Sequence, residues 1–186
     1  MNVSMFEAVL ATPVSPDRDH IRGPLDAPVS LVEYGDYECP YCGAAPPIVK
    51  AIEQQMGDAM QFVFRHFPLT TVHPHAQHAA EAAEAAAAQG KFWEMHDTLY
   101  ENQQNLDDPD LIAYAEALGL DVGRFTMELA QHVHMQKVRE DFMSGVRSGV
   151  NGTPTFFING LRHDGSWDYA TLLAAVQQAA LANAGA

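Results

Sequence analysis

The chain has 186 residues, of which 47% are hydrophobic, and a formal net charge of −14 with only 10 Lys and Arg. This length and apolar fraction indicate one globular domain with a sizeable core. The few basic residues are scattered, which argues against binding to nucleic acid or to anionic membrane surfaces, because both require clustered Lys or Arg.

The first part of the chain predicts a strand–helix–strand unit. Residues 1–17 contain prolines and little hydrophobic pattern, and we interpret them as an N-terminal arm. The apolar, β-branched run 29–34 predicts a buried strand. A helix would begin at Pro40, where proline suits the first turn, and end at Gly57. Residues 61–67 predict the second strand, and a crossover of this length favours parallel strands.

The middle of the chain predicts helices only. An Ala-rich segment opens after His73-Pro74 and ends at Gly90. Asp108-Pro109 and Asp121 have the residue types that begin helices. Further helical patterns cover 91–100, 109–118 and about 134–147. Because no strand pattern separates these segments, we expect one inserted helical cluster over residues 70–146.

The last part of the chain returns to strands. Residues 155–158 and 161–163 flank Asn159-Gly160, a dipeptide typical of a hairpin turn. We expect Ser166 to cap a final amphipathic helix. The order is β-α-β, a helical insertion, then β-β-α. This is an α/β fold with a mixed central sheet, whose main domain consists of residues 18–69 and 147–186.

Cys39 and Cys42 are the two cysteines of the chain and form one C-x-x-C motif. Closing so short a loop stabilises a protein by only about 2 kcal/mol, and a chain of this length has no need of it. The pair therefore indicates chemistry rather than scaffolding. A reversible dithiol and half of a metal site are both compatible with the spacing.

The helix start at Pro40 distinguishes the two thiols. Cys39 stands at the positive end of the helix dipole, which lowers a thiol pKa, and Cys42 follows one turn later on the same face. Residues three apart on a helix have Cα atoms about 5–6 Å apart, within the geometry of a disulfide. We therefore expect Cys39 to be the exposed nucleophile and Cys42 the resolving thiol.

Several motifs in the same order resemble a known family. The sequence is similar to the thioredoxin fold and specifically to DsbA-like disulfide oxidoreductases with a helical insertion, from about residue 20 onward. The C-x-x-C and the Thr-Pro-Thr motif are specific in combination, whereas each alone is weak. The matching segments are Val29–Tyr34, Glu38–Cys42, Phe64–Leu69, Gln89–Trp93 and Gly149–Phe156.

The resemblance implies roles for residues around the dithiol. Pro154 would have a cis peptide bond and pack against the cysteines, and the backbone of Thr153 would pair with an extended substrate segment. Pro40 and Tyr41, between the cysteines, would also contact substrate.

Glu33 stands six residues before Cys39, where the family keeps a buried acid. The residues alone leave two interpretations open. A carboxylate in an apolar strand would have a raised pKa and relay a proton to or from Cys42. Alternatively, Glu33 faces water at the end of the strand.

Tyr41 departs from DsbA, which has Pro-His between its cysteines. A neutral tyrosine lacks the cationic donor that histidine offers to a thiolate. We therefore predict that Cys39 is less acidic than the DsbA thiol, whose pKa is about 3.5. The Cys39–Cys42 couple should be less oxidising and closer to the glutaredoxin range.

The sequence thus predicts a thiol–disulfide oxidoreductase acting through a mixed disulfide at Cys39. It would need no dissociable cofactor and no metal, and its partners would be protein or small-thiol disulfides and an unidentified redox partner, not nucleic acid or membrane. The alternatives are a non-catalytic peptide-binding module and a zinc-binding protein in which histidines join the cysteines, drawn from His66, His73, His75 and His78.

The sequence also bears on location. No apolar run is long enough to span a membrane, and residues 1–13 lack the basic start of a signal peptide. We expect a cytoplasmic protein, or an exported one if a signal peptide has been removed.

Overall fold

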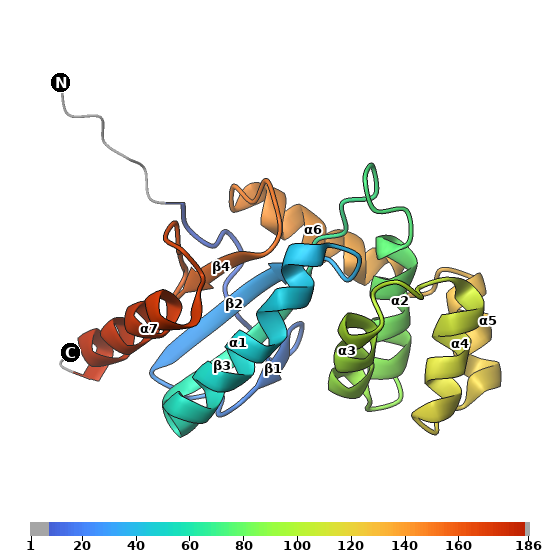
Figure 1. Cartoon of the computed structure of the whole chain (residues 1–186), viewed down its shortest axis with the longest axis horizontal. Coiled ribbons are helices and arrows are strands. Elements are labelled where there is room, and N and C mark those ends of the chain that lie inside the picture. Colours follow the sequence, from blue (N-terminus) through green and yellow to red (C-terminus); the bar gives the residue numbers. More distant parts are fainter. Residues whose placement is uncertain (1–7, 185–186) are drawn as a thin grey trace.

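The computed structural model describes residues 8–184 and contains a five-stranded mixed sheet (Figure 1). The order across the sheet is β1-β3-β2-β4-β5. The central strands β2 and β3 are parallel, as the β-α-β pattern predicts, and β1, β4 and β5 pair antiparallel with their neighbours. The strands are β1 (His20–Arg22), β2 (Val29–Gly35), β3 (Met60–His66), β4 (Thr155–Ile158) and β5 (Leu161–Arg162).

Helices lie on both faces of the sheet, and further helices extend to one side of it (Figure 1). α1 packs against α7, α3 and the strand β3, and α7 packs against β2 and β4, whereas α6 packs against β3. α2 contacts α3, α4, α5 and α6 and is the centre of the helical part. The helices are α1 (Pro40–Met56), α2 (Ala76–Ala87), α3 (Phe92–Glu101), α4 (Asp108–Ala117), α5 (Val122–Ala130), α6 (Met135–Arg147) and α7 (Tyr169–Ala184).

The strand β2 is buried on both faces, and its side chains alternate between two hydrophobic clusters. Leu31 belongs to the cluster that contains both cysteines, Phe64 and the inner faces of α1 and α7. Val32 and Tyr34 belong to the cluster on the opposite face, together with Phe157. Side chains two apart on a strand share a face, so Glu33 points to the same side as Leu31, toward the dithiol.

The segment before β1 is anchored to the sheet from residue 8 onward. The backbone N–H of Leu10 donates to the carbonyl of Gly160 at 2.8 Å, and the Leu10 side chain is buried. Arg65 of β3, fully buried, forms two hydrogen bonds of 2.9 Å with the carboxylate of Asp19. The expectation of an arm over 1–17 concerns in part residues 1–7, which lie outside the described residues.

Two details differ from the sequence-based expectations. The short strand β1 had no recognisable pattern, because three half-buried residues are too few to show a period. The first backbone N–H groups of α7 are capped by Asp168, which accepts from Thr171 at 3.0 Å. The prediction that Ser166 caps this helix is therefore wrong, since its hydroxyl accepts from Asp168 instead. Within residues 8–184, none of the helices is both long and apolar enough to cross a membrane.

Candidate active site

The dithiol lies where β2 ends and α1 begins. Cys39 is the N-cap of α1 with extended backbone angles, φ −74° and ψ 121°, and Pro40 occupies the first helical position. Proline fits there because its missing N–H would have no partner inside the helix. Cys42 faces the core and is fully buried, whereas Pro40 and Tyr41 are exposed, with Tyr41 at 71%.

Cys39 is less accessible than predicted. Only 4% of the residue is exposed, so the expectation that Cys39 is exposed is wrong. The reason is the loop before β4, because the Sγ of Cys39 lies 3.5 Å from the carbonyl oxygen of Thr153. The sequence predicts correctly that Cys39 stands at the start of its helix. It does not predict that a loop 114 residues away covers the thiol.

The two thiols have opposite pKa shifts. The hydrogen bond from Cys42, together with those from the backbone N–H groups of Cys42 and Tyr41, outweighs the opposing effect of burial and lowers the pKa of Cys39 to about 5. Burial raises the pKa of Cys42 well above its ordinary value of 9.0, and the hydrogen bond that Cys42 donates to Cys39 raises it further. At neutral pH the pair therefore holds a thiolate at Cys39 and a thiol at Cys42.

The loop that covers Cys39 contains the proline of the Thr-Pro-Thr motif. The peptide bond between Thr153 and Pro154 is cis. The hydroxyl of Thr155 donates to the carbonyl of Gly152 at 2.7 Å, which fixes the turn. The loop thus brings Thr153 and Pro154 to the entrance of α1, beside Cys39.

Glu33 lies on β2 and is 2% exposed. Its Oε1 has no hydrogen-bond partner among the described residues. Burial raises the pKa of Glu33 to about 8, against an opposing effect of Arg22 and with a smaller contribution from the charge at Cys39. The interpretation of Glu33 as a carboxylate that faces water is therefore wrong. A carboxyl group with this pKa gains and loses a proton near neutral pH.

Two further residues shape the loop before Cys39, and neither was recognised in the sequence. Asp36 is buried and accepts from the backbone N–H groups of Glu38 and Leu69 and from the ring of His73. Gln103, after α3, donates from Nε2 to the carbonyls of Tyr37 and Cys39 at 2.9 and 2.8 Å. An aspartate three residues before a helix N-cap, bonding to the backbone two residues on, is a usable signal, whereas nothing in the sequence marks Gln103.

A cavity of about 370 Å³ opens beside the dithiol. Glu38 lines it on the side of α1, and His75 lines it on the side of α2. These two residues bond to each other, with His75 Nδ1 2.8 Å from the Glu38 carboxylate. Because the cavity shares its wall with Pro40, a ligand there would lie next to the exposed edge of the C-x-x-C.

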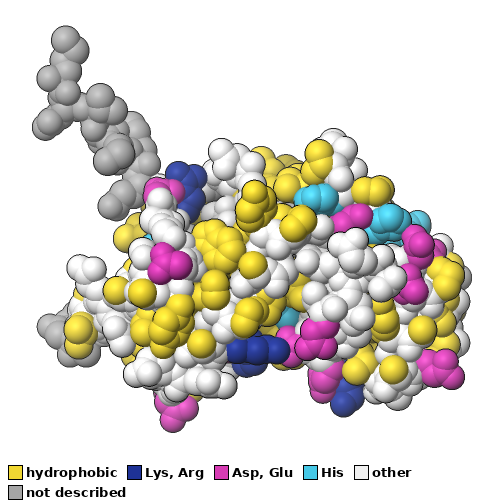
Figure 2. Space-filling model, in the orientation of Figure 1, with side chains coloured by type: hydrophobic (Ala, Val, Ile, Leu, Met, Phe, Trp, Pro, Cys, Tyr) yellow, Lys and Arg dark blue, Asp and Glu magenta, His cyan; other side chains and the backbone are white. Residues whose placement is uncertain are grey.

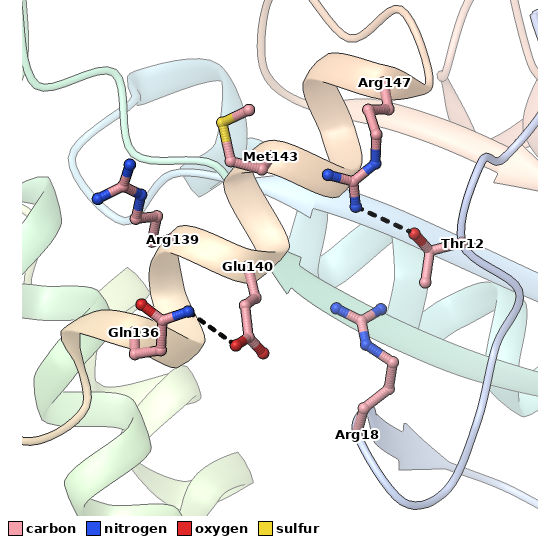
Figure 3. A pocket seen from close by; sticks show the side chains of 7 residues that line it. All are labelled: Thr12, Arg18, Gln136, Arg139, Glu140, Met143 and Arg147. Carbon is pink, nitrogen blue, oxygen red and sulfur yellow. Dashed lines mark hydrogen bonds between the residues drawn. The ribbon is translucent and has the colours of Figure 1, made fainter.

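A second cavity, of about 260 Å³, lies between the N-terminal segment and α6 (Figure 3). Arg18 and Arg147 face it, but Arg18 is already paired with Asp19 and Asp141. Figure 3 also shows the Glu140 carboxylate within the same hollow. Arg139 also lines this cavity, Arg147 donates to the hydroxyl of Thr12, and neither cysteine is part of the lining.

The structure separates the cysteines from the histidines proposed as zinc ligands. The groups of His, Cys, Asp and Glu close enough to hold a metal within residues 8–184 contain neither Cys39 nor Cys42. His73 and His75 are instead bonded to Asp36 and Glu38. The arrangement around the dithiol thus favours thiol chemistry over a metal site at the cysteines.

Comparisons with known proteins agree with this geometry. A family model described as thioredoxin matches residues 15–178. A Na(+)/H(+) antiporter NhaA 1 of Salinispora arenicola is 54% identical over 170 residues, which cover 91% of this chain and 26% of that protein. A Na(+)/H(+) antiporter NhaA 1 of Mycobacterium sp. (strain KMS) is 47% identical over a segment that covers 90% of this chain and 28% of that protein. The chain therefore spans about a quarter of the length of these curated relatives.

Solved structures match over nearly the whole chain. Oxidised BdbD from Bacillus subtilis has a TM-score of 0.79 and 24% identity, covering 94% of this chain and 99% of that one. A thioredoxin-like oxidoreductase from Silicibacter pomeroyi has a TM-score of 0.78 and 25% identity, with coverages of 89% and 93%. Wolbachia pipientis α-DsbA1 has a TM-score of 0.78 and 18% identity, with coverages of 94% and 96%. The predicted thioredoxin fold is confirmed.

Proposed function

Because this chain belongs to the thioredoxin family and has the fold of DsbA-like proteins, we propose that it is a thiol–disulfide oxidoreductase with Cys39 as nucleophile. The Cys39 thiolate attacks one sulfur of a substrate disulfide, forms a mixed disulfide and releases the first substrate thiolate. Cys42 then loses its proton and attacks the Sγ of Cys39. This step releases the second substrate thiolate and leaves the Cys39–Cys42 disulfide, so two electrons pass to the substrate. The reverse sequence oxidises a substrate dithiol.

The observation that carries the proposal is the division of charge between the two thiols. Cys39, with a pKa of about 5, is a thiolate at neutral pH, whereas the pKa of Cys42 is far higher. The thiolate is the form that attacks a disulfide. A pair in which both pKa values stayed near 9 would hold little thiolate at neutral pH, so this asymmetry favours exchange over a structural role.

We propose Glu33 as the proton acceptor for Cys42. The negative charge of Glu33 raises the pKa of Cys42, and the charge at Cys39 in turn raises that of Glu33. Once Cys39 is bound in a mixed disulfide, its charge is gone, so one obstacle to ionising Cys42 disappears. A carboxylate with a pKa of about 8 is matched to take that proton near neutral pH.

We propose that an extended substrate segment lies along the loop that holds Thr153 and Pro154. Backbone pairing at a free edge is a common way to bind extended peptides. Tyr41, whose side chain is 71% exposed, would contact the segment on the other side of Cys39. Protein disulfides and small disulfides both satisfy this chemistry.

An insulin-reduction assay with dithiothreitol tests the proposal. The wild-type protein should accelerate the precipitation of reduced insulin, and Cys39→Ser should abolish this acceleration. Cys42→Ser should instead accumulate a mixed disulfide at Cys39, visible as an added mass. Equal behaviour of the wild-type protein and Cys39→Ser would contradict the proposal.

A peptide-binding module without turnover is the second candidate, favoured by the 4% exposure of Cys39. A module of this kind would bind an unfolded peptide near Thr153 equally well with Cys39→Ser, and it would leave insulin intact. Peptide affinity and insulin reduction measured on the same two proteins therefore separate the two functions.

We further propose that the couple is milder than that of DsbA. The Cys39 pKa of about 5 lies above the value of about 3.5 known for DsbA, in the direction that Tyr41 predicts. A less stabilised thiolate makes a weaker oxidant. The reduction potential should fall in the glutaredoxin range, about −200 to −230 mV, rather than near −120 mV, and a glutathione redox titration measures it.

The curated relatives suggest where the substrates lie. Their names describe Na(+)/H(+) antiporters, and the matching segment makes up 26% of the first of them. We propose that this dithiol unit acts next to a membrane protein of that kind. Cys42→Ser should then trap mixed disulfides in the membrane fraction of cells. Trapped partners confined to the fraction without membranes would contradict this placement.

A further inference from the structure

Three side chains from two distant segments of the sequence meet on the helical part of the chain. His78 and Glu81 lie three residues apart on α2, and His132 lies in the turn between α5 and α6. One potential metal-ligating atom from each lies within 4.8 Å of the others. Figure 2 shows histidine and acidic side chains gathered on this side of the molecule, over the helices.

Glu81 is the buried member of the group. Its residue is 1% exposed, and its carboxylate accepts from Gln77 Nε2 at 2.9 Å and from His132 Nδ1 at 3.0 Å. The amide of Gln77 is neutral, and His132 is charged only when protonated. A buried carboxylate is costly without a compensating charge, and a divalent cation between Glu81 and His132 would supply it whatever the protonation state of His132.

His78 has one ring nitrogen fixed and one available. Its Nδ1 lies 2.7 Å from the carboxylate of Asp108, at the start of α4. An ionised carboxylate only accepts hydrogen bonds, so the proton is on Nδ1 and the neutral ring keeps a lone pair on Nε2. A carboxylate that holds the other nitrogen of a histidine is the usual support of a metal ligand, because it fixes the tautomer and raises the basicity of the ring.

The neighbouring His75 has no ring nitrogen available to bind a metal. His75 bonds through both nitrogens, to Glu38 at 2.8 Å and to Asp107 at 2.9 Å. These two contacts occupy both ring nitrogens with acceptors and leave no lone pair for a metal.

The other cluster of potential ligands is already closed by hydrogen bonds. His20 and His66 both lie 2.7 Å from the same oxygen of Glu84. The ring of His20 is also stacked on Phe92, with centroids 3.5 Å apart. A metal ion would have to break both bonds to Glu84, whereas at His132 it would replace one hydrogen-bonded pair, that of His132 Nδ1 with Glu81.

We propose that His78, Glu81 and His132 bind a divalent transition-metal ion, best matched by Zn²⁺, with Asp108 as the residue that positions His78. Two imidazole nitrogens and one carboxylate oxygen are a donor set typical of zinc. Bonds of about 2.0–2.1 Å in a tetrahedron place the ligand atoms about 3.3 Å apart. The side chains of His78 and His132 are 32% and 47% exposed, so they can rotate inward and leave the fourth position to water.

Such an ion would connect α2, the α5–α6 turn and, through Asp108, the start of α4. Its binding would add a bridge between segments that already pack against one another, and so would stabilise the folded state by mass action. The proposal is independent of the activity of the dithiol, since neither cysteine belongs to the group.

Calorimetric titration with Zn²⁺ tests the site. The full chain without a histidine tag is first stripped with chelator and oxidised, because a Cys39–Cys42 disulfide removes the thiols as competing ligands. One equivalent should bind saturably. His132→Gln and Glu81→Gln should each weaken binding at least about tenfold, and Asp108→Asn by about tenfold through loss of support for His78. His163→Gln, which changes a histidine whose ring lies against the Ser166 carbonyl, should bind as the wild type does.

Three results would overturn the proposal: no saturable binding up to about 1 mM Zn²⁺, the same affinity in His132→Gln as in the wild type, or a loss of binding in His20→Gln greater than in His132→Gln. Circular dichroism of each variant checks the fold. The exposed position of His132 keeps the test decisive if Glu81→Gln fails to fold. Thermal unfolding with and without Zn²⁺ should show a rise in midpoint for the wild type and none for His132→Gln.

Discussion

Two buried glutamates, one beside the dithiol and one in the helical part, have opposite pKa shifts. Glu33 on β2 is 2% exposed and Glu84 on α2 is 6% exposed. Burial without a full set of partners raises the pKa of Glu33 to about 8. Burial opposes ionisation of Glu84 as well, but hydrogen bonds and the charges of His20 and His66 outweigh it and hold its pKa well below the ordinary range.

The difference shows that burial alone does not decide the state of an acid. Near the dithiol, an oxygen of Glu33 has no hydrogen-bond partner within residues 8–184, and the raised pKa lets the group exchange a proton near neutral pH. In the helical part, two histidines converge on one oxygen of Glu84, so the carboxylate stays ionised and serves as a structural anchor. Similar burial thus gives a carboxyl group that titrates near neutral pH in one region and a carboxylate that stays ionised in the other.

The largest expected effect comes from removing the anchored charge. Glu84→Gln leaves His20 and His66 without their anionic partner, and breaking a buried pair of this kind costs about 4 kcal/mol of unfolding free energy. Chemical denaturation measures it. Glu116→Gln, an exposed acid on α4, should change stability by less than about 0.5 kcal/mol. A loss in Glu84→Gln no larger than in Glu116→Gln would contradict the anchoring role.

The pH dependence of this contribution has a definite sign. The folded pKa of Glu84 is depressed below its ordinary value of 4.5. Its contribution is therefore fully present above pH 4.5 and is lost as the pH falls below that value. The stability difference between the wild type and Glu84→Gln should shrink with acidification.

Glu33→Gln should have the opposite effect on stability. The folded pKa of about 8 lies above the ordinary 4.5, so the folded state binds the proton more tightly, and wild-type stability falls as pH rises from 4.5 to 8. Between the ordinary pKa and pH 7, this loss of unfolding free energy amounts to at most about 3 kcal/mol. We expect Glu33→Gln to gain about 2 kcal/mol, because its amide still lacks partners. A variant that is less stable than the wild type at pH 8 would contradict this sign.

The same substitution should slow the resolving step. Without an acceptor for the Cys42 proton, we expect release of the mixed disulfide to slow about tenfold at pH 7, while attack by Cys39 changes little. Quenched-flow trapping of the mixed disulfide separates the two steps. The difference in release rate between the wild type and Glu33→Gln should narrow at high pH, where hydroxide replaces the carboxylate as acceptor of the Cys42 proton. Equal slowing of both steps would indicate a structural effect instead.

The smallest expected effect concerns the loop that positions Cys39. Gln103→Ala removes two hydrogen bonds to the carbonyls of Tyr37 and Cys39, which should lower stability by about 1 kcal/mol. Gln104→Ala is the matched control, because Gln104 is the next residue and its side chain is exposed. Thermal unfolding compares the two variants, and equal midpoints would contradict a stabilising role for the Gln103 hydrogen bonds.

Much of this arrangement follows from the sequence. The strand and helix patterns around the C-x-x-C predict β2, α1 and β3, and Asn159-Gly160 predicts the β4–β5 turn. Glu33 in an apolar strand leaves a buried acid and a water-facing acid both open, and the structure shows the buried one. These features depend on local periodicity and on residue types with strong preferences, which a single sequence displays.

Contacts across the fold could not be predicted. The carbonyl of Thr153 covers Cys39 from 114 residues away, and Gln103 reaches it from 64 residues away. The bonds of His20 and His66 to Glu84 likewise join β1, β3 and α2. Such partners depend on how helices pack around the sheet, and no spacing in the sequence encodes them.

The central claim is that Cys39 alone is a thiolate at neutral pH. Alkylation of the reduced protein with iodoacetamide over a range of pH, with the modified cysteine identified by mass spectrometry, tests it directly. We predict modification at Cys39 with a midpoint near pH 5 and none at Cys42 below pH 9. Modification of Cys42 first, or a midpoint for Cys39 near 9, would contradict the account.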